Sequence, residues 1–185
     1  MHAALGGRVV SQRTIDFALR ECSLGWLLIA ASERGICSVR FGDSEEALEG
    51  ALRAELPFAV LERSDVRLKP WSDVLIARID GNARTQSQTT GFAVDLPFDV
   101  SASSFQRRVW DALQQIPRGE TRAYSEVAAS LGVASGARAV ARACAANPVA
   151  VLVPCHRVVS KDGGLGGYRW GVERKRALLA AERAR

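Results

Sequence analysis

The sequence has few of the side chains that bind metal ions. Its 185 residues include two histidines, His2 and His156, and four cysteines. The cysteines are 15, 107 and 11 residues apart, so they form no C-x-x-C pair, and no histidine stands at ligand spacing from them. Zinc sites need such clustered donors. We therefore expect neither a metal site nor a disulfide framework, and no cofactor.

Membrane-spanning and secretory segments are also missing. Residues 1–11 lack the apolar central run of a signal peptide. The hydrophobic fraction of 48% and the charged fraction of 24% are those of an average globular protein. We therefore expect a cytoplasmic protein with reduced thiols and no membrane partner. The length allows one ordinary domain, or a small domain attached to a medium one.

The basic residues are concentrated in the second half of the chain. Residues 1–100 hold 11 Lys and Arg against 14 Asp and Glu, a net charge of −3, whereas residues 101–185 hold 14 against 6, a net charge of +8. This asymmetry suggests that one part of the protein meets a polyanion, of which nucleic acid is the commonest. A basic surface that is simply solvated is the alternative.

The first half has the pattern of a small α/β unit. Short runs of strand-forming residues are separated by turn residues, and stretches with helical spacing are bounded by capping residues or proline. The expected elements are a β-hairpin of 24–31 and 36–41, a helix from Glu45 to Pro57 capped by Ser44, a helix over 71–79 and, after a polar connection over 82–90, a strand through Phe92, Val94 and Leu96.

The second half has mainly helical spacing. Apolar residues recur one turn apart over 105–116, and Pro117 ends this helix. Two short helices over 124–131 and 136–146 are joined by the turn 132–135, which is the arrangement of a helix-turn-helix. An ordinary helical hairpin has the same spacing, but the basic charge of this half favours a DNA-binding pair.

Cys155 and His156 lie together between two apolar runs, Val151–Val153 and Val158–Val159. A thiol buried among aliphatic side chains is inert, so a reactive cysteine in such a place needs a base beside it. Pro154 precedes the pair, where we expect an apolar strand to end in a loop. A lone buried cysteine is usually packing, and we interpret the other three in that way. The histidine makes Cys155 a candidate nucleophile.

Several motifs occur in the order and at the spacings of one known family. They are FQRRVW at 105–110, IPRGET at 116–121, RAV at 138–140, ANP at 146–148, PCHRVV at 154–159 and GYRWG at 167–171. From about Asp16 to its end the chain resembles the O6-alkylguanine-DNA alkyltransferases, and among them the carboxy-terminal repair portion of the Ada adaptive-response protein. The zinc-cysteine domain of Ada has no counterpart here, so the resemblance carries over guanine repair alone.

The resemblance implies a two-part α/β (α+β) fold. A small amino-terminal sheet-and-helix domain over 1–100 supports a mainly helical domain over 101–185 that binds DNA and accepts the alkyl group. Cys155 takes the alkyl group from O6 of guanine, irreversibly and once per molecule. His156 acts as the base through a water, Glu182 orients the imidazole, and Asn147 is the hinge before the active-site turn. Glu182 belongs to a last helix expected over 172–182.

The resemblance also implies how the lesion is reached. The partner is double-stranded DNA containing O6-alkylguanine, with O4-alkylthymine as a second lesion, bound by a monomer. Because O6 is inaccessible inside a duplex, the nucleotide is flipped out while the helix-turn-helix enters the minor groove. The implied DNA-binding residues are Tyr124, Gly136, Ala137, Arg138, which replaces the flipped base, and Ala141. The guanine pocket is formed by the carbonyl of Val158, the ring of Tyr168 and the backbone N–H of Arg169.

Two other functions fit parts of this pattern. An alkyl-lesion sensor would flip and hold the base without transfer, but relatives of that kind lack the acceptor cysteine that Cys155 supplies. An unrelated Cys-His hydrolase or acyltransferase would turn over small esters or peptides many times and would have no need of a basic half. Turnover of esters separates this last class from the transferase.

Overall fold

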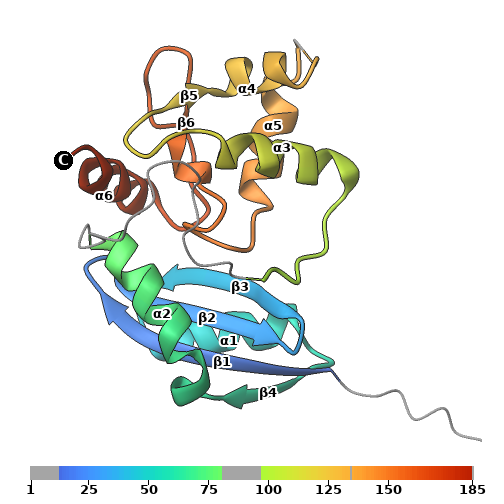
Figure 1. Ribbon diagram of the computed structural model, residues 1–185, viewed down its shortest axis with the longest axis vertical. Helices are drawn as coiled ribbons and strands as arrows, with labels where there is room; N and C mark the ends of the chain where they lie inside the picture. The colour runs from blue at the N-terminus through green and yellow to red at the C-terminus, as the bar shows by residue number, and fades with distance from the viewer. Residues whose placement is uncertain (1–12, 81–96, 134, 185) are drawn as a thin grey trace, which may run out of the picture.

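The computed structural model describes residues 13–80, 97–133 and 135–184. A four-stranded sheet with its two helices forms one layer of the molecule, and the remaining helices gather beyond strand β3 (Figure 1). This arrangement confirms the mixed α and β fold expected from the sequence. None of the helices within the described ranges is long and apolar enough to cross a membrane.

The sheet has the strand order β3-β2-β1-β4, with β4 parallel to β1 and the other neighbours antiparallel. The β2–β3 hairpin confirms the expected pair of strands, whereas β1 and β4 are additional. In β1 the apolar Ile15, Phe17 and Leu19 alternate on one face, but β4 is short and mostly exposed. The strands are β1 (Thr14–Cys22), β2 (Gly25–Ser32), β3 (Gly35–Gly42) and β4 (Val60–Arg63).

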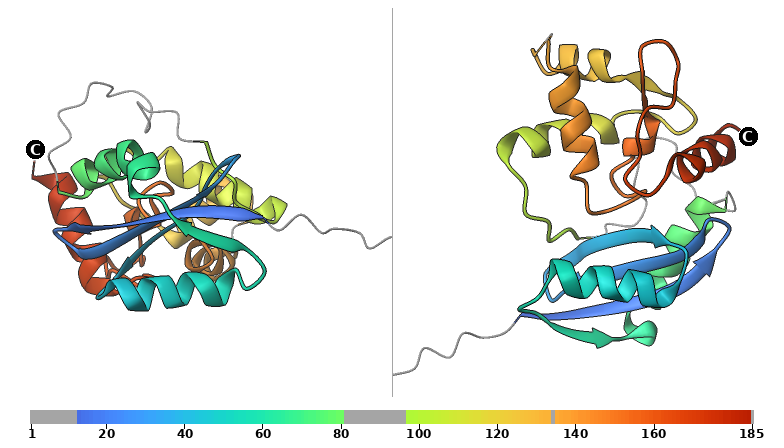
Figure 2. Two further views of the ribbon diagram at one scale, coloured as in Figure 1. Left: turned by 90° about the horizontal axis from the view of Figure 1, so that it is seen from below. Right: turned by 180° about the vertical axis from the view of Figure 1, so that it is seen from behind.

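Two helices cover opposite faces of the sheet (Figure 2). Helix α1 (Glu45–Glu55) begins at the expected cap, where Ser44 Oγ accepts a hydrogen bond from Ala47 N, and its Leu48 and Leu52 pack on one face. Helix α2 packs on the other face with a separate set of buried residues. The alternating side chains of the strands are therefore buried on both sides.

Helix α2 (Asp65–Ile79) begins six residues before the expected start at Trp71. Pro70 lies inside the helix, where it removes one backbone hydrogen bond. Leu68 and Leu75, on either side of it, are fully buried against the sheet. Burial of this face offsets the lost hydrogen bond, so packing overrides the local signal.

The helical half contains the four expected helices. Trp110 Nε1 donates a hydrogen bond of 2.9 Å to the carbonyl of Ala143, which joins the first of them to α5. The expected strand at 92–96, the connection at 82–90 and the turn residue Ala134 lie outside the described residues. The elements are α3 (Ser104–Gln114), β5 (Arg122–Ala123), α4 (Tyr124–Ser130), α5 (Ala137–Ala145), the 3₁₀ helix η1 (Cys155–Arg157), β6 (Val158–Val159) and α6 (Val172–Arg183).

The expected strand at Val151–Val153 is wrong, because these residues form a turn. Leu152 N donates to the carbonyl of Ala150, and Val151 has a φ of 66°. Leu152 and Val153 are apolar because they fill the core, not because they pair in a sheet. A β-branched residue at positive φ is strained, so the surrounding structure must hold this turn in place.

The edge of strand β3 binds the segment that leads into this turn. Val39 N donates to the carbonyl of Pro148 at 2.9 Å, and the carbonyl of Val39 accepts from Ala150 N at 3.0 Å. Ile36 pairs in the same way with residues 97–99. One buried cluster therefore continues from α2 through the sheet into the helical half, and the sheet helps to place Cys155.

Candidate active site

Cys155 and His156 lie in η1, a single 3₁₀ turn. Their residues are 3% and 1% exposed. Cys155 N donates to the carbonyl of Val153, and Arg157 N donates to the carbonyl of Pro154. The proline begins a tight turn in which the thiol and the imidazole are both held inside the core.

Asn147 connects the end of α5 to the thiol. Its side chain is fully buried, and Nδ2 lies 3.0 Å from the carbonyl of Val153 and 3.3 Å from Cys155 Sγ. Oδ1 accepts from Val149 N, which fixes the orientation of the amide. An N–H group that points at sulfur stabilises a thiolate more than a thiol. Asn147 therefore favours the anionic form of Cys155.

The resting thiol is nevertheless protonated at neutral pH. Burial raises the pKa of Cys155 to about 11, although Asn147, Lys175 and Arg169 act to lower it. A nearby base must remove the proton when the sulfur reacts. Burial also raises the pKa of Cys144 to about 12, which agrees with its interpretation as a packing residue.

His156 is a neutral imidazole with one nitrogen available. Burial lowers its pKa, against the opposing effect of Glu182. Nε2 lies 3.0 Å from Glu182 Oε1, so a neutral ring carries its hydrogen on Nε2 and leaves Nδ1 as an acceptor. Nδ1 is buried and has no hydrogen-bond partner within the described chain. The ring thus has the tautomer and the free lone pair of a general base.

Glu182 is held by more than the histidine. Arg157 donates from Nη2 to Oε1 at 2.7 Å and from Nε to Oε2 at 3.0 Å, and Gly119 N donates to Oε2 at 3.2 Å. Burial alone raises the pKa of Glu182, but the hydrogen bonds from His156 and Arg157 outweigh it and hold the pKa well below its ordinary range. The carboxylate is therefore ionised and fixed beside the imidazole.

Lys175 closes the site from α6, a role that the sequence interpretation missed. The side chain is fully buried, and Nζ donates to the carbonyls of Val158 at 2.5 Å, Gly167 at 3.4 Å and Leu165. It thereby holds the loop after β6 against that strand. Lys175 stands one turn before Leu178 and Leu179 on the inward face, which is the signal that could have found it.

Tyr124 packs against this loop, and Tyr168 follows it in the sequence. Gly166 has a φ of 64°, and a Cβ there would lie 3.2 Å from the ring of Tyr124, so the loop packs closely on that ring. Burial raises the pKa of Tyr124 to about 12, which leaves a neutral phenol. The hydroxyl of Tyr168 is buried without a partner in the described chain, and its ring meets Trp170 edge to face at 5.1 Å.

The helix pair α4 and α5 presents a basic surface. Arg138 and Arg142 are exposed one turn apart on α5, and neither makes a hydrogen bond or ion pair within the described ranges. Gly136, Ala137 and Ala141 keep the amino-terminal part of this helix narrow. A free guanidinium on a narrow helix can approach a phosphate or a base closely.

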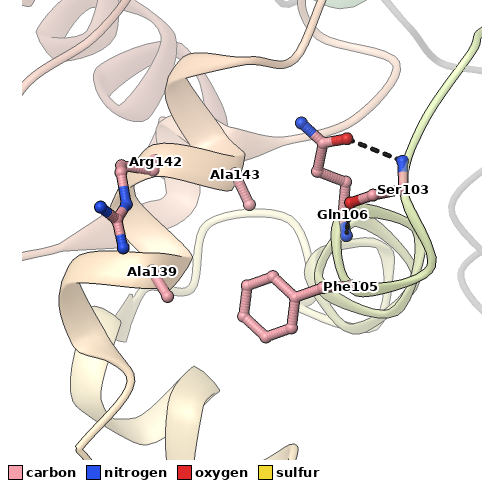
Figure 3. Close-up of a pocket in the computed structure, with 6 residues that line it drawn as sticks. All are labelled: Ser103, Phe105, Gln106, Ala139, Arg142 and Ala143. Carbon is pink, nitrogen blue, oxygen red and sulfur yellow. Dashed lines mark hydrogen bonds between the residues drawn. The ribbon is translucent and has the colours of Figure 1, made fainter.

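A shallow hollow of about 220 Å³ lies between the start of α3 and the side of α5 (Figure 3). Figure 3 shows the capping box in which Ser103 N donates to Gln106 Oε1. None of its lining residues belongs to the group around Cys155, so this hollow is not part of the candidate active site. The lining residues are Ser103, Phe105, Gln106, Ala139, Arg142 and Ala143.

The structure brings most of the predicted site residues together. Asn147 contacts Cys155, and Glu182 contacts the adjacent His156. Val158 accepts from Lys175, whose charge acts on Cys155. Arg169 also contacts this group, since its Nη1 donates to the carbonyl of Asn147. The predicted DNA-binding residues of α5 lie apart from these contacts, on an adjoining helix surface.

Comparisons with known proteins identify the relatives of this chain. The family model of the 6-O-methylguanine DNA methyltransferase DNA-binding domain matches residues 104–184. The inducible methylated-DNA–protein-cysteine methyltransferase of Bacillus subtilis is 38% identical over 75% of this chain and 73% of its own length. The regulatory protein Ada of Salmonella typhimurium is 43% identical over 96% of this chain. The chain spans about half the length of the Ada proteins that it matches.

Solved structures show the same relationship. The crystal structure of Mycobacterium tuberculosis OGT in complex with DNA matches with a TM-score of 0.72 and 32% sequence identity, and the match covers 91% of this chain and 93% of that one. The match includes the sheet layer as well as the helical half. The chain belongs to the family of methylated-DNA–protein-cysteine methyltransferases.

Proposed function

We propose that this chain repairs DNA by moving the alkyl group from O6 of a guanine to Sγ of Cys155, once per molecule. The observation that carries the proposal is the network around the thiol. Asn147 Nδ2 lies 3.3 Å from the sulfur. His156 Nε2 forms a hydrogen bond with Glu182, and the buried Nδ1 of the same ring has no partner in the described chain. A buried acceptor of this kind suits one water that takes the thiol proton.

The reaction needs only groups in the network and the substrate. A water on His156 Nδ1 removes the proton from Sγ as the sulfur attacks the alkyl carbon. The S–C bond forms, the C–O6 bond breaks, and its electron pair passes to guanine. The guanine takes up the proton that left Sγ, returned from the imidazolium through water, and so regains its ordinary form. Glu182 stabilises the imidazolium that results. The thioether cannot leave again, so each molecule acts once.

We also propose how guanine is held. The carbonyl of Val158 accepts from Lys175 and keeps a second lone pair for the exocyclic amine of the base. Tyr168 forms a wall, and the backbone N–H of Arg169 donates to O6 as negative charge develops there. Tyr124, a neutral phenol beside the loop, contacts the base and its neighbouring phosphate. The lesion is O6-alkylguanine, with O4-alkylthymine as a second substrate.

The α4–α5 pair acts as a helix-turn-helix in this proposal. Arg138 enters the base stack in place of the flipped guanine, and Gly136, Ala137 and Ala141 allow α5 to lie close to the minor groove. The exposed, unpaired guanidinium of Arg138 within the described chain supports this role. The protein works as a monomer in the cytoplasm, where its four free cysteines stay reduced.

The two parts of the chain have different tasks. Residues 101–185 carry every proposed catalytic side chain, and this part contains the segment that the family model matches. Residues 1–100 support it through the pairing of Val39 with Pro148 and Ala150. The two parts differ in their proposed tasks, but they share one buried cluster and so are not packed as separate cores.

The test is a stoichiometric transfer experiment. Purified, reduced protein is mixed with a duplex that contains one O6-methylguanine, and the peptides are analysed by mass spectrometry. We expect one methyl group on the peptide with Cys155 and none on those with the other cysteines. The Cys155→Ala variant should bind the duplex and leave the lesion intact.

The same experiment separates the alternatives. A lesion sensor would protect the damaged duplex from nucleases while Cys155 stayed unmodified. A Cys-His hydrolase would release product from a small ester in many turnovers without DNA. Methylation of Cys155 that stops at one group per molecule is expected of the transferase alone.

A further inference from the structure

We infer that Arg169 is a positioning residue for the alkyl acceptor. Its guanidinium, held by Glu55 of the sheet layer, fixes the backbone of Asn147, whose side chain contacts Cys155 Sγ. The inference rests on the proposed function, because it assigns a role in that reaction. The sheet layer then takes part in the chemistry through a chain of polar contacts as well as through packing.

The Arg169 side chain is fixed by three parts of the protein. Nη1 donates to the carbonyl of Asn147 at 3.3 Å, and Nη2 donates to Glu55 Oε2 at 3.3 Å. The guanidinium carbon also lies 5.9 Å from the centre of the Trp170 ring, in cation–π distance. The side chain is only 34% exposed. An arginine with these contacts differs from a solvated surface cation, since each contact restricts its rotation.

Glu55 is itself held by a buried cation. Arg40 of strand β3 is 8% exposed in its side chain, and its Nη2 lies 2.6 Å from Glu55 Oε2 in an ion pair. Arg40 Nε donates to Ser38 Oγ at 2.7 Å, which fixes the guanidinium on the strand. The carboxylate at the end of α1 therefore joins two guanidiniums, one from the sheet and one from the active-site loop. The Glu55 side chain is 41% exposed, so its position depends on the buried guanidinium of Arg40.

The contact at Asn147 matters because the chain beyond it is strained. Val39 holds Pro148 and Ala150 by backbone hydrogen bonds, and Val151 then takes a φ of 66° before the turn to Cys155. Strained residues persist only where their surroundings determine the conformation. Arg169 binds the carbonyl of Asn147, before the strained residue, and strand β3 binds the backbone of the residues that follow Asn147. Both constraints fix the amide that donates to sulfur.

Arg169 also adds positive charge near the thiol. Among the groups that shift the pKa of Cys155, Arg169 acts in the same direction as Asn147 and Lys175, towards the thiolate. Loss of its charge should therefore raise the pH at which the sulfur ionises. The titratable and charged groups that act on Cys155 or are acted on by it are Lys175 of α6, Arg169, Cys144 of α5, Tyr124 of α4 and Tyr168.

The experiment compares four single variants of the full chain and the double variant Glu55→Gln/Arg169→Met. Arg169→Met removes the guanidinium, Arg169→Lys keeps its charge, and Glu55→Gln weakens the anchor while it leaves an acceptor for Arg40. Glu49→Gln is the matched control, because Glu49 is another carboxylate of α1 paired with an arginine, Arg53, away from the site. Each protein is tested for methyl transfer from duplex DNA and for the reaction of Cys155 with iodomethane from pH 8 to 12, a range that includes the raised Cys155 pKa of about 11. The second reaction forms S–CH₃, releases iodide and needs no DNA.

We expect Arg169→Met to slow both reactions about 3- to 10-fold at pH 8, as for loss of a partly exposed charge-assisted hydrogen bond. Its iodomethane profile should move to higher pH, and Arg169→Lys should move it back towards wild type. Glu55→Gln should have a similar but smaller effect and should add little to Arg169→Met, because it acts through the same guanidinium. Glu49→Gln should match wild type.

The iodomethane profile decides the inference. If the iodomethane profile of Arg169→Met has the same midpoint pH and the same rate as that of wild type, the positioning role is wrong. If Glu55→Gln and Arg169→Met are strictly additive, Glu55 does not act through Arg169 and the chain of contacts is wrong. If wild type reacts with iodomethane but never with alkylated DNA, the proposed function is wrong while the variants still report on Arg169.

Discussion

Replacing Glu182 with glutamine tests the network around the thiol most directly. The Glu182 side chain is 8% exposed and bonds both His156 and Arg157. The amide keeps the shape but removes the charge, so Arg157 loses its counter-ion. Breaking a buried ion pair costs about 3 kcal/mol, which lowers Tm by roughly 6 to 12 °C in a chain of this size. Loss of an effective general base should slow methyl transfer about 10²- to 10⁴-fold.

The pH dependence gives this prediction a second measurement. Since the pKa of Glu182 is held below its ordinary range in the folded protein, its ionised form contributes stability above the unfolded-state pKa of about 4.3. That contribution is lost as the pH falls through the folded pKa. The difference in Tm between wild type and Glu182→Gln should thus be constant above about pH 5 and narrow below about pH 4.

Calorimetry across this range and single-turnover transfer from an O6-methylguanine duplex check both parts. Glu173→Gln is the control, because Glu173 lies on the same helix, is 82% exposed and pairs only with Arg176 in the described chain. It should change neither quantity appreciably. A Glu182→Gln protein that transfers methyl at the wild-type rate, or a Tm difference as large at pH 3 as at pH 7, would refute the assigned role.

Three further changes address other parts of the site. Arg138→Ala should slow repair about 10-fold in duplex but little in single-stranded DNA, measured by single-turnover rates at two salt concentrations; equal losses on both substrates would contradict the stacking role. Lys175→Met should lower the free energy of unfolding by about 1 to 3 kcal/mol and speed hydrogen exchange in the loop after β6, since the carbonyls that Nζ binds lose their donor. Val151→Asn should stabilise the protein by about 0.5 to 1 kcal/mol in urea unfolding, because asparagine tolerates positive φ better than valine.

Elements with strong local signals could be predicted from the sequence. Helix α1 has both a capping serine and a proline stop, and its observed bounds follow them. The β2–β3 hairpin has two strand-forming runs joined by turn residues. In these segments, local preference and tertiary packing favour the same structure.

Elements whose signals conflict with packing were wrong or missed. Helix α2 was expected over 71–79, but burial of Leu68 and Leu75 accompanies a helix that continues through Pro70. The apolar run at Val151–Val153 indicated a strand, but these residues form a turn, and Leu152 and Val153 are buried in the core. A run of apolar residues indicates that a segment is buried, but burial alone does not distinguish a strand from a turn or fix where a helix begins.

The candidate site divides in the same way. Adjacency of Cys155 and His156 is visible in the sequence, whereas Glu182 lies 26 residues from His156 and was assigned only through the family resemblance. Nothing local indicates that Arg157 binds that carboxylate or that Gly119 N donates to it. Such contacts depend on how α6 packs against η1, which three-dimensional structure alone reveals.

The distribution of these contacts explains why the sheet layer matters to a site that lies in the other half. A fragment of residues 101–185 would keep Cys155 and its proposed catalytic partners. It would lose the pairing of Val39 with Pro148 and Ala150, and also the carboxylate that holds Arg169. The positive φ of Val151 would then be free to relax, and the Asn147 amide would no longer be held on sulfur. Retaining the reacting groups is therefore insufficient, because their geometry is set from outside the half that contains them.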